Sequence, residues 1–394
     1  MIPISQAPIS GNDILQTLYA DVITKTNGFR VLEDSLSEYL NCKNIILTSS
    51  GSVALYNLLR AYNLKKEDEI IMPAYFCENI PRLVHSMGLK VKFADIEPHT
   101  YNIDPNNLNE IITKNTKVVI AVHMFGYPCQ ISDIVEISHD SGALVIEDCA
   151  QAMGAKYDNL NVGTIGDSGF FSMGMGKPLT TINGGIIISS DKNIINTVNK
   201  YTSEFKKCNL IDNIKLFSYM LGYNIANSRH LYSLIHKLRK TNSKVGFVGI
   251  QELMYSYTNL QSILGTHQLS KLDSFNKIRI VNANYLMDKL VDDTLHFPQY
   301  PNNSNPIFLR LPVSIENVKP NEINNLIKIF EHAGIEVSKY MDVSLPQLFN
   351  KKSNECPISE TITKKTLTLP THPNVTKKDL DKIIQIMTEW RSPL

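Results

Sequence analysis

Short apolar runs alternate with helical patterns through the first half of this sequence, and this alternation restricts the fold more than any other feature. The runs have the length of strands, and turn-forming residues bound them. Strands that alternate with helices are typical of a mainly parallel sheet with helices on both faces. We therefore predict an α/β fold, with strands at residues 44–48, 69–75, 90–96, 117–126 and 143–148 and helices at about 76–87, 104–113 and 130–140.

Polar and reactive residues follow several of these strands at their carboxyl ends. In open α/β sheets the ligand lies beyond the carboxyl ends of the strands. Ser52, Asp148 and the turn from Tyr75 to Cys77 fall at such ends. We therefore expect the functional site at this edge of the sheet. His123, which ends another strand, is either a neighbour of the site or a core histidine with a hydrogen-bonded ring.

A helical segment begins directly after the small residues Ser49 to Ser52. The first N–H groups of a helix have no partner within the helix, so a strand, a small-residue turn and a helix start together form an anion site. The same residues also fit a helix that simply begins with a serine cap. Both interpretations stay open on the sequence alone.

The stretch from Leu144 to Gly185 carries the most specific chemistry. An apolar strand ends in Glu147 and Asp148, and Lys177 follows in a segment that is rich in glycine and nearly free of charge. A lysine with little charge to pair with can have a lowered pKa, and its amine can form a Schiff base. An aspartate that faces a pyridinium nitrogen is the usual companion of such a lysine in pyridoxal 5'-phosphate (PLP) enzymes. Ser172 could hydrogen-bond a phosphate. A strand with a loop lysine is, by itself, also common in other α/β proteins.

The spacing of four motifs makes this stretch distinctive. The patterns EDxAQxxGA, VGxxGDxGFFS, GK and GG follow one another in this order and resemble the DegT/DnrJ/EryC1/StrS family of sugar aminotransferases. The run TNLQSILGTHQLSKLD from Thr258 and the closing segment from Cys356 resemble the same family. The resemblance covers about residues 28–190 and 245–390.

The resemblance implies a fold-type I PLP-dependent transferase. Such a chain has a large α/β domain, here residues 1–260, with a mainly parallel sheet of the seven-stranded type between helices. A small α+β domain, here residues 261–394, follows it. Members of this fold build their sites at a dimer interface, so the resemblance also implies a homodimer.

The resemblance assigns roles to residues of this sequence. Lys177 would hold PLP as a Schiff base and later move the proton of the substrate carbon, and Asp148 would keep the pyridine nitrogen protonated. Gly51, Ser52 and Ser172 would contact the phosphate.

Two further positions are implied on the cofactor's ring. Gln151 would lie near the phenolic oxygen, although a glutamine that caps the following turn is an equal alternative. Cys77 falls where the family has the aromatic residue that stacks on the ring.

The implied reaction takes an amino group, in most relatives from glutamate, to a keto-sugar, most often one linked to a nucleotide, for surface polysaccharide or related glycoconjugate biosynthesis. Two alternatives stay open. A PLP-dependent sugar dehydratase or deoxygenase shares the fold, but such relatives typically carry histidine in place of the lysine. A PLP-binding protein of the same fold without turnover is the other.

The sequence departs from the family in a second region. The family lends an asparagine and an arginine to the phosphate of the neighbouring subunit, and Met254 and Ser256 stand in their places. Residues 191–250 form a longer insertion than the family usually carries. We expect this insertion, or a serine or tyrosine within 255–257, to supply substitute contacts. The first candidates are its basic residues Arg229, Lys237, Arg239 and Lys240, unless they only form a solvated face.

Composition gives no support for several other classes of protein, namely nucleic-acid-binding, membrane-associated, zinc-binding and disulfide-rich proteins. A net charge of +1 gives no reason to expect binding to nucleic acid or to an anionic membrane. The 6 cysteines include no CxxC pair, so neither a zinc site nor a disulfide framework is indicated. There is no apolar run long enough to span a membrane and no signal-peptide pattern at the N-terminus, so we expect a cytoplasmic protein.

Overall fold

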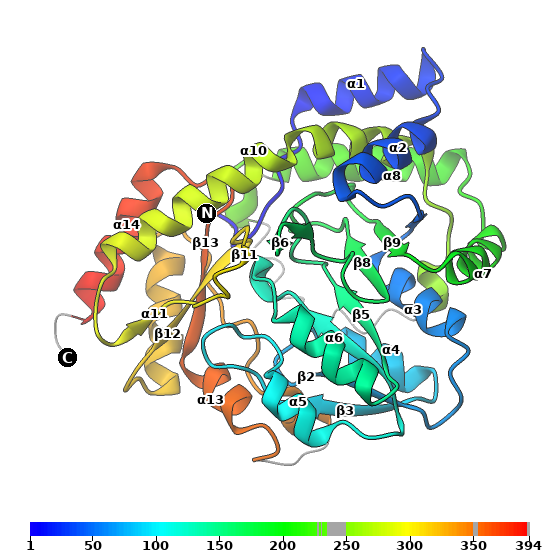
Figure 1. The fold of residues 1–394 in the computed structure, drawn as a ribbon. Coiled ribbons are helices and arrows are strands. Elements are labelled where there is room, and N and C mark those ends of the chain that lie inside the picture. Colours follow the sequence, from blue (N-terminus) through cyan, green and yellow to red (C-terminus); the bar gives the residue numbers. More distant parts are fainter. Residues whose placement is uncertain (227, 230, 235–249, 350–353, 392–394) are drawn as a thin grey trace.

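The computed structural model describes residues 1–226, 228–229, 231–234, 250–349 and 354–391 (Figure 1). Its centre is a 7-stranded sheet in the order β1-β9-β8-β5-β4-β2-β3. The strands are β1 (Ile45–Thr48), β2 (Glu69–Pro73), β3 (Lys90–Ala94), β4 (Thr116–Val122), β5 (Leu144–Asp148), β8 (Ser168–Ser172) and β9 (Gly185–Ser189).

The sheet is mainly parallel, as predicted. β3, β2, β4, β5 and β8 pair in parallel, and only β9 runs against its two neighbours, β8 and β1. All five strands predicted before residue 150 are present, a few residues shorter than expected at some ends. β8 was not predicted as a strand. It is short and lies within the motif GDxGFFS, where glycines obscure the apolar run.

Helices cover both faces of this sheet, because side chains alternate along each strand. Ile146 packs with the leucines of α3 on one face, whereas Val145 packs with Ile131 and Ile134 of α6 on the other. The helices on the first face are α3 (Gly51–Ala61), α4 (Asn79–Ser86) and α7 (Lys192–Ser203); those on the second are α2 (Gly28–Leu40), α5 (Pro105–Ile111) and α6 (Ile131–Asp140) (Figure 1).

Local signals explain where these helices start and end. Asp104 caps α5 by accepting the N–H of Asn106 at 2.9 Å, and Pro105 fixes the first turn. Asn41 ends α2 in the left-handed conformation with φ 51°.

The C-terminal part forms a second, smaller layer of helices against a 3-stranded antiparallel sheet. Its strands are β10 (Leu295–His296), β12 (Arg310–Ile315) and β13 (Thr366–Pro370), and its helices are α11 (Pro320–His332), α13 (Pro357–Lys365) and α14 (Lys377–Arg391). Residues 320–332 form a helix, and Thr376 stands at the start of the last one, where its N–H donates to Asp379 at 2.8 Å.

One long helix, α10 (Asn259–Lys289), joins the two parts (Figure 1). It packs on α1 (Gly11–Val22) and α2, and also on α14 of the C-terminal part. Because this helix packs on both parts of the molecule, the domain boundary expected near residue 260 stays a prediction.

The N-terminal arm crosses from one part of the molecule to the other. Ile2 pairs with the C-terminal part, since its N–H donates to Gly334 and its carbonyl accepts from Glu336, both at 2.8 Å. The arm then continues to α1, which packs against α8 (Leu210–Ala226). The remaining short elements are β6 (Lys156–Tyr157), β7 (Leu160–Asn161), β11 (Ser304–Asn305), η1 (Met124–Gly126), η2 (Ile250–Leu253) and α12 (Leu345–Phe349).

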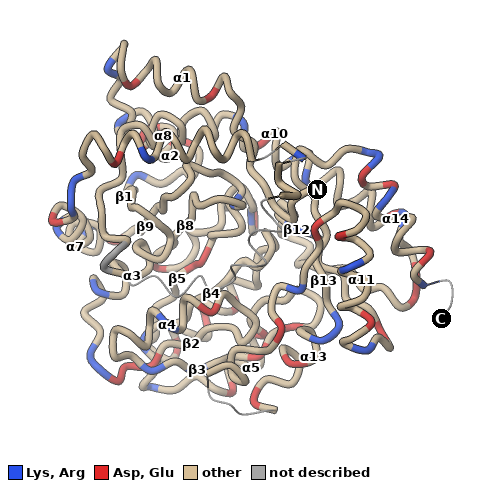
Figure 2. The backbone as a smooth tube through the Cα atoms, turned by 180° about the vertical axis from the view of Figure 1, so that it is seen from behind, with Lys and Arg blue, Asp and Glu red and all other residues tan. Residues whose placement is uncertain are grey.

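Charges of both signs are spread along the described chain, in keeping with the net charge of +1 (Figure 2). Among the described residues, no helix combines the length and the apolar character that crossing a membrane requires.

Candidate active site

Asp148 ends β5, next to the middle of the large sheet, and its residue surface is 4% exposed. The N–H of Ala150 donates to its Oδ1 at 2.9 Å. No described residue donates a hydrogen bond to its Oδ2. A carboxylate on a buried residue, with one oxygen that accepts no hydrogen bond from the chain, suits a protonated nitrogen of a ligand.

The environment of Asp148 disfavours its charge. Burial raises the pKa of Asp148 to about 6, and the hydrogen bond from Ala150 and the charges of Lys177 and His123 offset only part of this effect. In the folded protein without a ligand, ionisation of Asp148 therefore lowers the free energy of unfolding.

We expect Asp148→Asn to stabilise the cofactor-free protein above about pH 6. In the wild type, the raised pKa keeps a proton on folded Asp148 between pH 3.8 and about 6, while the unfolded chain has lost it. The free energy of unfolding therefore falls as the pH rises through this window, in total by about 3 kcal/mol. Asparagine does not titrate, so its variant lacks this loss. Urea unfolding across the window measures the difference, and parallel curves for the two proteins would contradict it.

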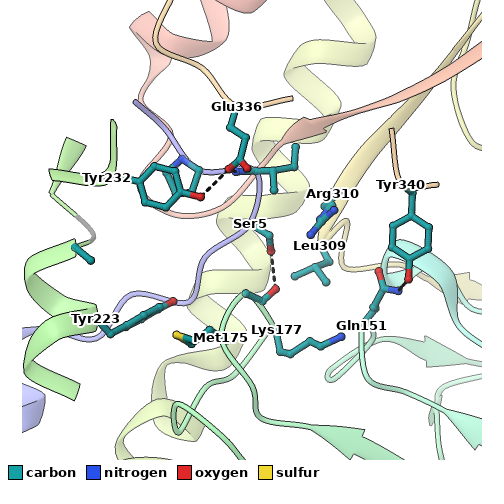
Figure 3. Close-up of a pocket in the computed structure, with 14 residues that line it drawn as sticks. Ser5, Gln151, Met175, Lys177, Tyr223, Tyr232, Leu309, Arg310, Glu336 and Tyr340 are labelled. Carbon is teal, nitrogen blue, oxygen red and sulfur yellow. Dashed lines mark hydrogen bonds between the residues drawn. The ribbon is translucent and has the colours of Figure 1, made fainter. Parts of the chain in front are cut away.

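Lys177 lies after a glycine-rich turn between β8 and β9, and two contacts fix its backbone. Gly176 has φ +79°, which glycine adopts without strain, and the N–H of Lys177 donates to Gly174 at 3.3 Å. From the N-terminal arm, the Ser5 hydroxyl donates to the Gly176 carbonyl at 2.7 Å (Figure 3). The lysine therefore projects from a turn that the arm holds in place.

Burial lowers the pKa of the Lys177 amine. The charges of Asp148 and Cys77 oppose this effect, and Arg310 adds to it. A lowered pKa increases the share of neutral amine, the form that attacks carbonyl carbons and accepts protons. The predicted pair of Asp148 and Lys177 is thus brought together, since each charge shifts the pKa of the other.

The start of α3 lies directly against Ser172. Ser50 caps the helix by accepting the N–H of Val53 at 3.2 Å. A Cβ at Gly51 would lie 3.0 Å from the Cβ of Ser172, so only glycine allows this approach without displacement. The cap and the anion site are therefore compatible. Ser50 supplies the cap, while the N–H groups of Gly51 and Ser52 and the Ser172 hydroxyl lie at the helix start, where an anion binds.

The Lys177 side chain faces a cavity of about 340 Å³. Figure 3 shows that its walls come from the large sheet, the C-terminal part and the N-terminal arm. Gln151 faces this cavity, and its Nε2 donates to the hydroxyl of Tyr340 at 3.3 Å. This favours the ligand-facing interpretation of Gln151 over the turn cap.

Cys77 is half-buried after β2, and the charges of Lys177 and Asp148 act on its thiol, whose pKa burial raises. Cys77 thus lies near Lys177 and Asp148, and the position where the family has a stacking aromatic residue holds a small side chain here. The adjacent Tyr75 and Phe76 are 1% and 2% exposed and belong to the core.

His123 is a core histidine rather than a wall of the cavity. It is fully buried, and its Nε2 lies 2.9 Å from Oε2 of Glu147. Cys149 joins these two in a cluster that could in principle hold a metal ion. However, Glu147 also accepts the N–H groups of Gly163, Ile165 and Gly166, each at 2.7 Å, so we infer that it anchors the turn before β8.

Most residues that line the cavity were not predicted from the sequence. Ser5, Arg310, Glu336 and Tyr340 come from the arm and the C-terminal part, far from the motifs in sequence. Nothing in their local sequence marks them. A different signal, such as the register of the C-terminal sheet, would have been needed to place them.

Met254 and Tyr255 line a separate cavity of about 470 Å³, whereas Ser256 lines a neighbouring cavity of about 320 Å³. The Ser256 N–H donates to the Lys206 carbonyl at 2.9 Å, which places Lys206 and Lys207 beside Met254. Lys215 of α8 lines the same cavity.

Of the basic residues that the sequence suggested for this role, only Arg229 lies among the described residues, and it does not line this cavity. Arg229 donates to both carboxylate oxygens of Asp379, at 3.0 and 2.6 Å, and to the Asn374 carbonyl. Its guanidinium is therefore engaged within the chain and is no longer a candidate for the phosphate. Lys237, Arg239 and Lys240 lie outside the described residues.

These features fit PLP. The close approach of Gly51 and Ser172 forms a cradle for a phosphate at a helix start, and the buried residue Asp148 has one oxygen, Oδ2, to which no described residue donates. Lys177 presents an amine with a lowered pKa, and the charge of Asp148 acts on this amine.

The family comparison agrees with this geometry. Residues 10–388 match the model of the DegT/DnrJ/EryC1/StrS aminotransferase family. The chain is similar to a GDP-perosamine synthase of Escherichia coli O157:H7, with 27% identity over 78% of this chain and 87% of that protein. It is also similar to a GDP-4-keto-6-deoxy-D-mannose 3-dehydratase of Escherichia coli O55:H7, with 28% identity over 71% and 69%.

A solved structure shows the same fold. The PLP form of a sugar aminotransferase of Streptococcus pneumoniae, Spr1654, superposes with a TM-score of 0.79 and 21% identity, covering 100% of this chain and 99% of that chain.

Proposed function

The chain belongs to the DegT/DnrJ/EryC1/StrS aminotransferase family of PLP-dependent sugar aminotransferases, and from this premise we propose that it transfers an amino group from glutamate to a nucleotide-linked keto-sugar. The observation that carries the proposal is the convergence of Lys177, which faces one cavity, with Asp148, since the charge of each acts on the other. The nucleotide-linked acceptor is supported by the GDP-sugar in the name of the relative. Surface polysaccharide or related glycoconjugate biosynthesis is the process that such a product would serve.

Each site residue has a proposed role toward one part of the cofactor. When bound, PLP supplies an electrophilic carbon and a ring that takes up electrons from the carbon that loses its proton. We propose that Asp148 holds a proton at the ring nitrogen and that Gly51, Ser52 and Ser172 hold the phosphate. Gln151 and Cys77 would lie along the ring.

Lys177 has two proposed tasks. Its neutral amine would hold the cofactor, and once free it would accept and return the proton of the reacting carbon. The Ser5 contact to Gly176 supports these tasks, because it fixes the turn that carries Lys177.

A sugar dehydratase is the second candidate function, since one relative has that name. Lys177 favours the aminotransferase, because dehydratases of this family typically have histidine in its place. A PLP-binding protein without turnover would show neither reaction.

One experiment separates these three functions. The PLP-loaded protein is incubated with glutamate labelled with a heavy nitrogen isotope and with candidate keto-sugar nucleotides, and the products are weighed by mass spectrometry. Labelled nitrogen in the sugar supports the aminotransferase, and a product that has lost water supports the dehydratase. An unchanged sugar combined with failure of glutamate to convert PLP would contradict both enzymes.

We further propose that the protein acts as a homodimer. Large apolar side chains stand exposed on the neighbouring helices α1 and α8, including Leu15, Tyr19, Ile211 and Tyr219 at 59–68% exposure. A contiguous exposed apolar face marks an interaction surface, and a second copy of this chain is the occupant that we propose. Light scattering during size-exclusion chromatography tests this directly.

In such a dimer, the lysines around Met254 would replace the asparagine and the arginine that the family lends to the phosphate of the neighbouring subunit. Lys206, Lys207 and Lys215 are exposed and line one cavity together. We expect their joint replacement by glutamine to weaken binding of PLP or of the sugar nucleotide by about threefold to tenfold at low salt, since exposed charges contribute little each. Screening should reduce the difference at high salt.

The control for this variant replaces Lys65, Lys66 and Lys114 by glutamine. These lysines are also exposed, but they precede β2 and β4 and so lie at the opposite edge of the sheet from the site. Equal affinities for both ligands in the two triple variants would contradict the proposal.

A further inference from the structure

One wall of the Lys177 cavity comes from the insertion at residues 191–250. The insertion contributes Tyr223 and Ala226 of α8, and Tyr232 beyond the end of this helix. Figure 3 shows the two tyrosines on one side of the cavity, whereas Gln151 lies on the other side, toward which the Lys177 side chain points. A substrate that reacts at Lys177 therefore lies between its reacting carbon and this wall.

Contacts to distant segments hold the wall in place. The Tyr223 hydroxyl donates to the carbonyl of Ala7 in the N-terminal arm at 3.2 Å, and the adjacent Asn224 donates to another arm carbonyl at 2.6 Å. The Tyr232 hydroxyl donates to Oε2 of Glu336 in the C-terminal part at 2.8 Å. The wall is thus tied to both other parts of the cavity and has a defined position.

The wall is mainly apolar. Because both tyrosine hydroxyl groups bond to the arm and to Glu336, their rings contribute mainly carbon atoms to the cavity. Ala226 and Met175, whose surface is 52% exposed, extend this apolar side. Gln151 and Arg310 stand among the polar residues of the opposite side. The cavity therefore has one polar side, next to the reacting amine, and one apolar side.

We propose that this wall binds the sugar ring of the acceptor and determines which sugars fit. The proposal rests on the proposed function, because it takes a keto-sugar as the second substrate. A sugar ring carries its hydroxyl groups around its rim and leaves C–H faces, which pack on aromatic rings. The cavity of about 340 Å³ is near the lower end of the range for small-molecule sites, about 300–1,000 Å³. A change in the size of a wall residue should therefore change the fit of the sugar.

The amino donor is the competing occupant of this wall. Glutamate has a carboxylate at each end of a short carbon chain, and an apolar wall offers neither carboxylate a hydrogen bond. The wall also lies on the side of the cavity away from Gln151, toward which Lys177 points. It therefore faces the part of a substrate that is remote from the reacting carbon. Both points favour the sugar ring over glutamate.

The test separates the two half-reactions of the PLP-loaded protein. Absorbance follows the conversion of PLP by L-glutamate, and then the reverse conversion by the keto-sugar nucleotide that takes up labelled nitrogen in the experiment proposed above. Ala226→Leu places a larger side chain in the wall. We expect it to raise the concentration of this keto-sugar nucleotide for half-maximal rate about 10- to 100-fold, the usual penalty of overpacking. The corresponding concentration of L-glutamate should change less than about threefold.

Two substitutions of one tyrosine separate its ring from its hydroxyl. Tyr223→Ala removes the ring and should weaken the keto-sugar nucleotide about 10-fold. Tyr223→Phe keeps the ring and loses only the contact to Ala7, so it should stay within about threefold of the wild type. This pair also tests the proposal if Ala226→Leu fails to fold.

Ala61→Leu is the matched control for the larger side chain. Ala61 is also a half-buried alanine at the end of a helix, since it ends α3, and it does not line the cavity. It lies about 15 Å along this helix from the start that faces the site. It should change neither half-reaction.

Three results overturn the proposal. An unchanged sugar half-reaction in Ala226→Leu would show that the wall does not limit the acceptor, and a loss confined to L-glutamate would assign the wall to the donor. Equal losses in Tyr223→Ala and Tyr223→Phe would show that Tyr223 acts only through the arm. If no keto-sugar nucleotide takes up nitrogen with the wild-type protein, the proposed function fails instead, and this is known before any variant is compared.

Discussion

Replacement of Lys177 by alanine is expected to abolish covalent attachment of PLP and to lower amino transfer by at least about a thousandfold, while the fold is kept. No other described lysine faces the cavity beside Asp148. The variant loses both proposed tasks at once, attachment of the cofactor and movement of the substrate proton. Its backbone should remain in place, because the contacts that hold the turn are made by main-chain atoms of Gly174 and Gly176.

Reduction with borohydride followed by mass spectrometry measures the attachment, and labelled nitrogen measures the transfer. Lys92→Ala is the matched control, because Lys92 is also a partly buried lysine, donates to the Ile111 carbonyl and lies on β3 at the far edge of the sheet. It should retain PLP and activity. A Lys177→Ala protein that still carries PLP covalently, on whatever residue, would contradict the assignment of Lys177 as the residue that holds PLP.

The sequence was sufficient to predict the sheet and the residues at its carboxyl edge. Short apolar strands with helices between them have few possible arrangements, so Asp148 and the α3 start could be placed from the sequence alone. The pairing of Gly51 with Ser172 could not be derived this way, because it depends on β9 running between β1 and β8. The family resemblance, and not the pattern of strands and helices, predicted that Gly51 and Ser172 contact the same phosphate.

The rest of the cavity depends on contacts between distant segments. Ser5, Arg310 and Tyr340 become neighbours of Lys177 only when the arm and the C-terminal sheet pack against the large sheet. No local pattern reports such packing. The expectation for Arg229 failed for the same reason, since a cluster of positive residues in sequence does not reveal that Asp379 neutralises one of them.

Asp148→Asn is the second prediction with a large effect. The variant should bind PLP yet transfer amino groups about 100- to 1000-fold more slowly, the usual loss when one preorganised electrostatic partner is removed. An amide cannot stabilise a positive ring nitrogen as a carboxylate does, so the ring takes up electrons less readily. The loss should fall on the rate of the half-reaction and leave the donor concentration for half-maximal rate nearly unchanged.

The same substitution should thus have opposite consequences with and without the cofactor. Without PLP, Asp148→Asn removes a buried carboxylate whose raised pKa marks it as costly, and the protein becomes more stable. With PLP, the carboxylate has its partner, and its loss slows the reaction.

Reconstitution with PLP methylated on the ring nitrogen distinguishes this role from a structural one, because the methylated ring is positively charged without a protein partner. Recovery of much of the rate in Asp148→Asn would confirm the role of Asp148. A variant that stays equally slow with the methylated cofactor would show that Asp148 acts through the shape of the site, and its proposed charge at the ring nitrogen would be wrong.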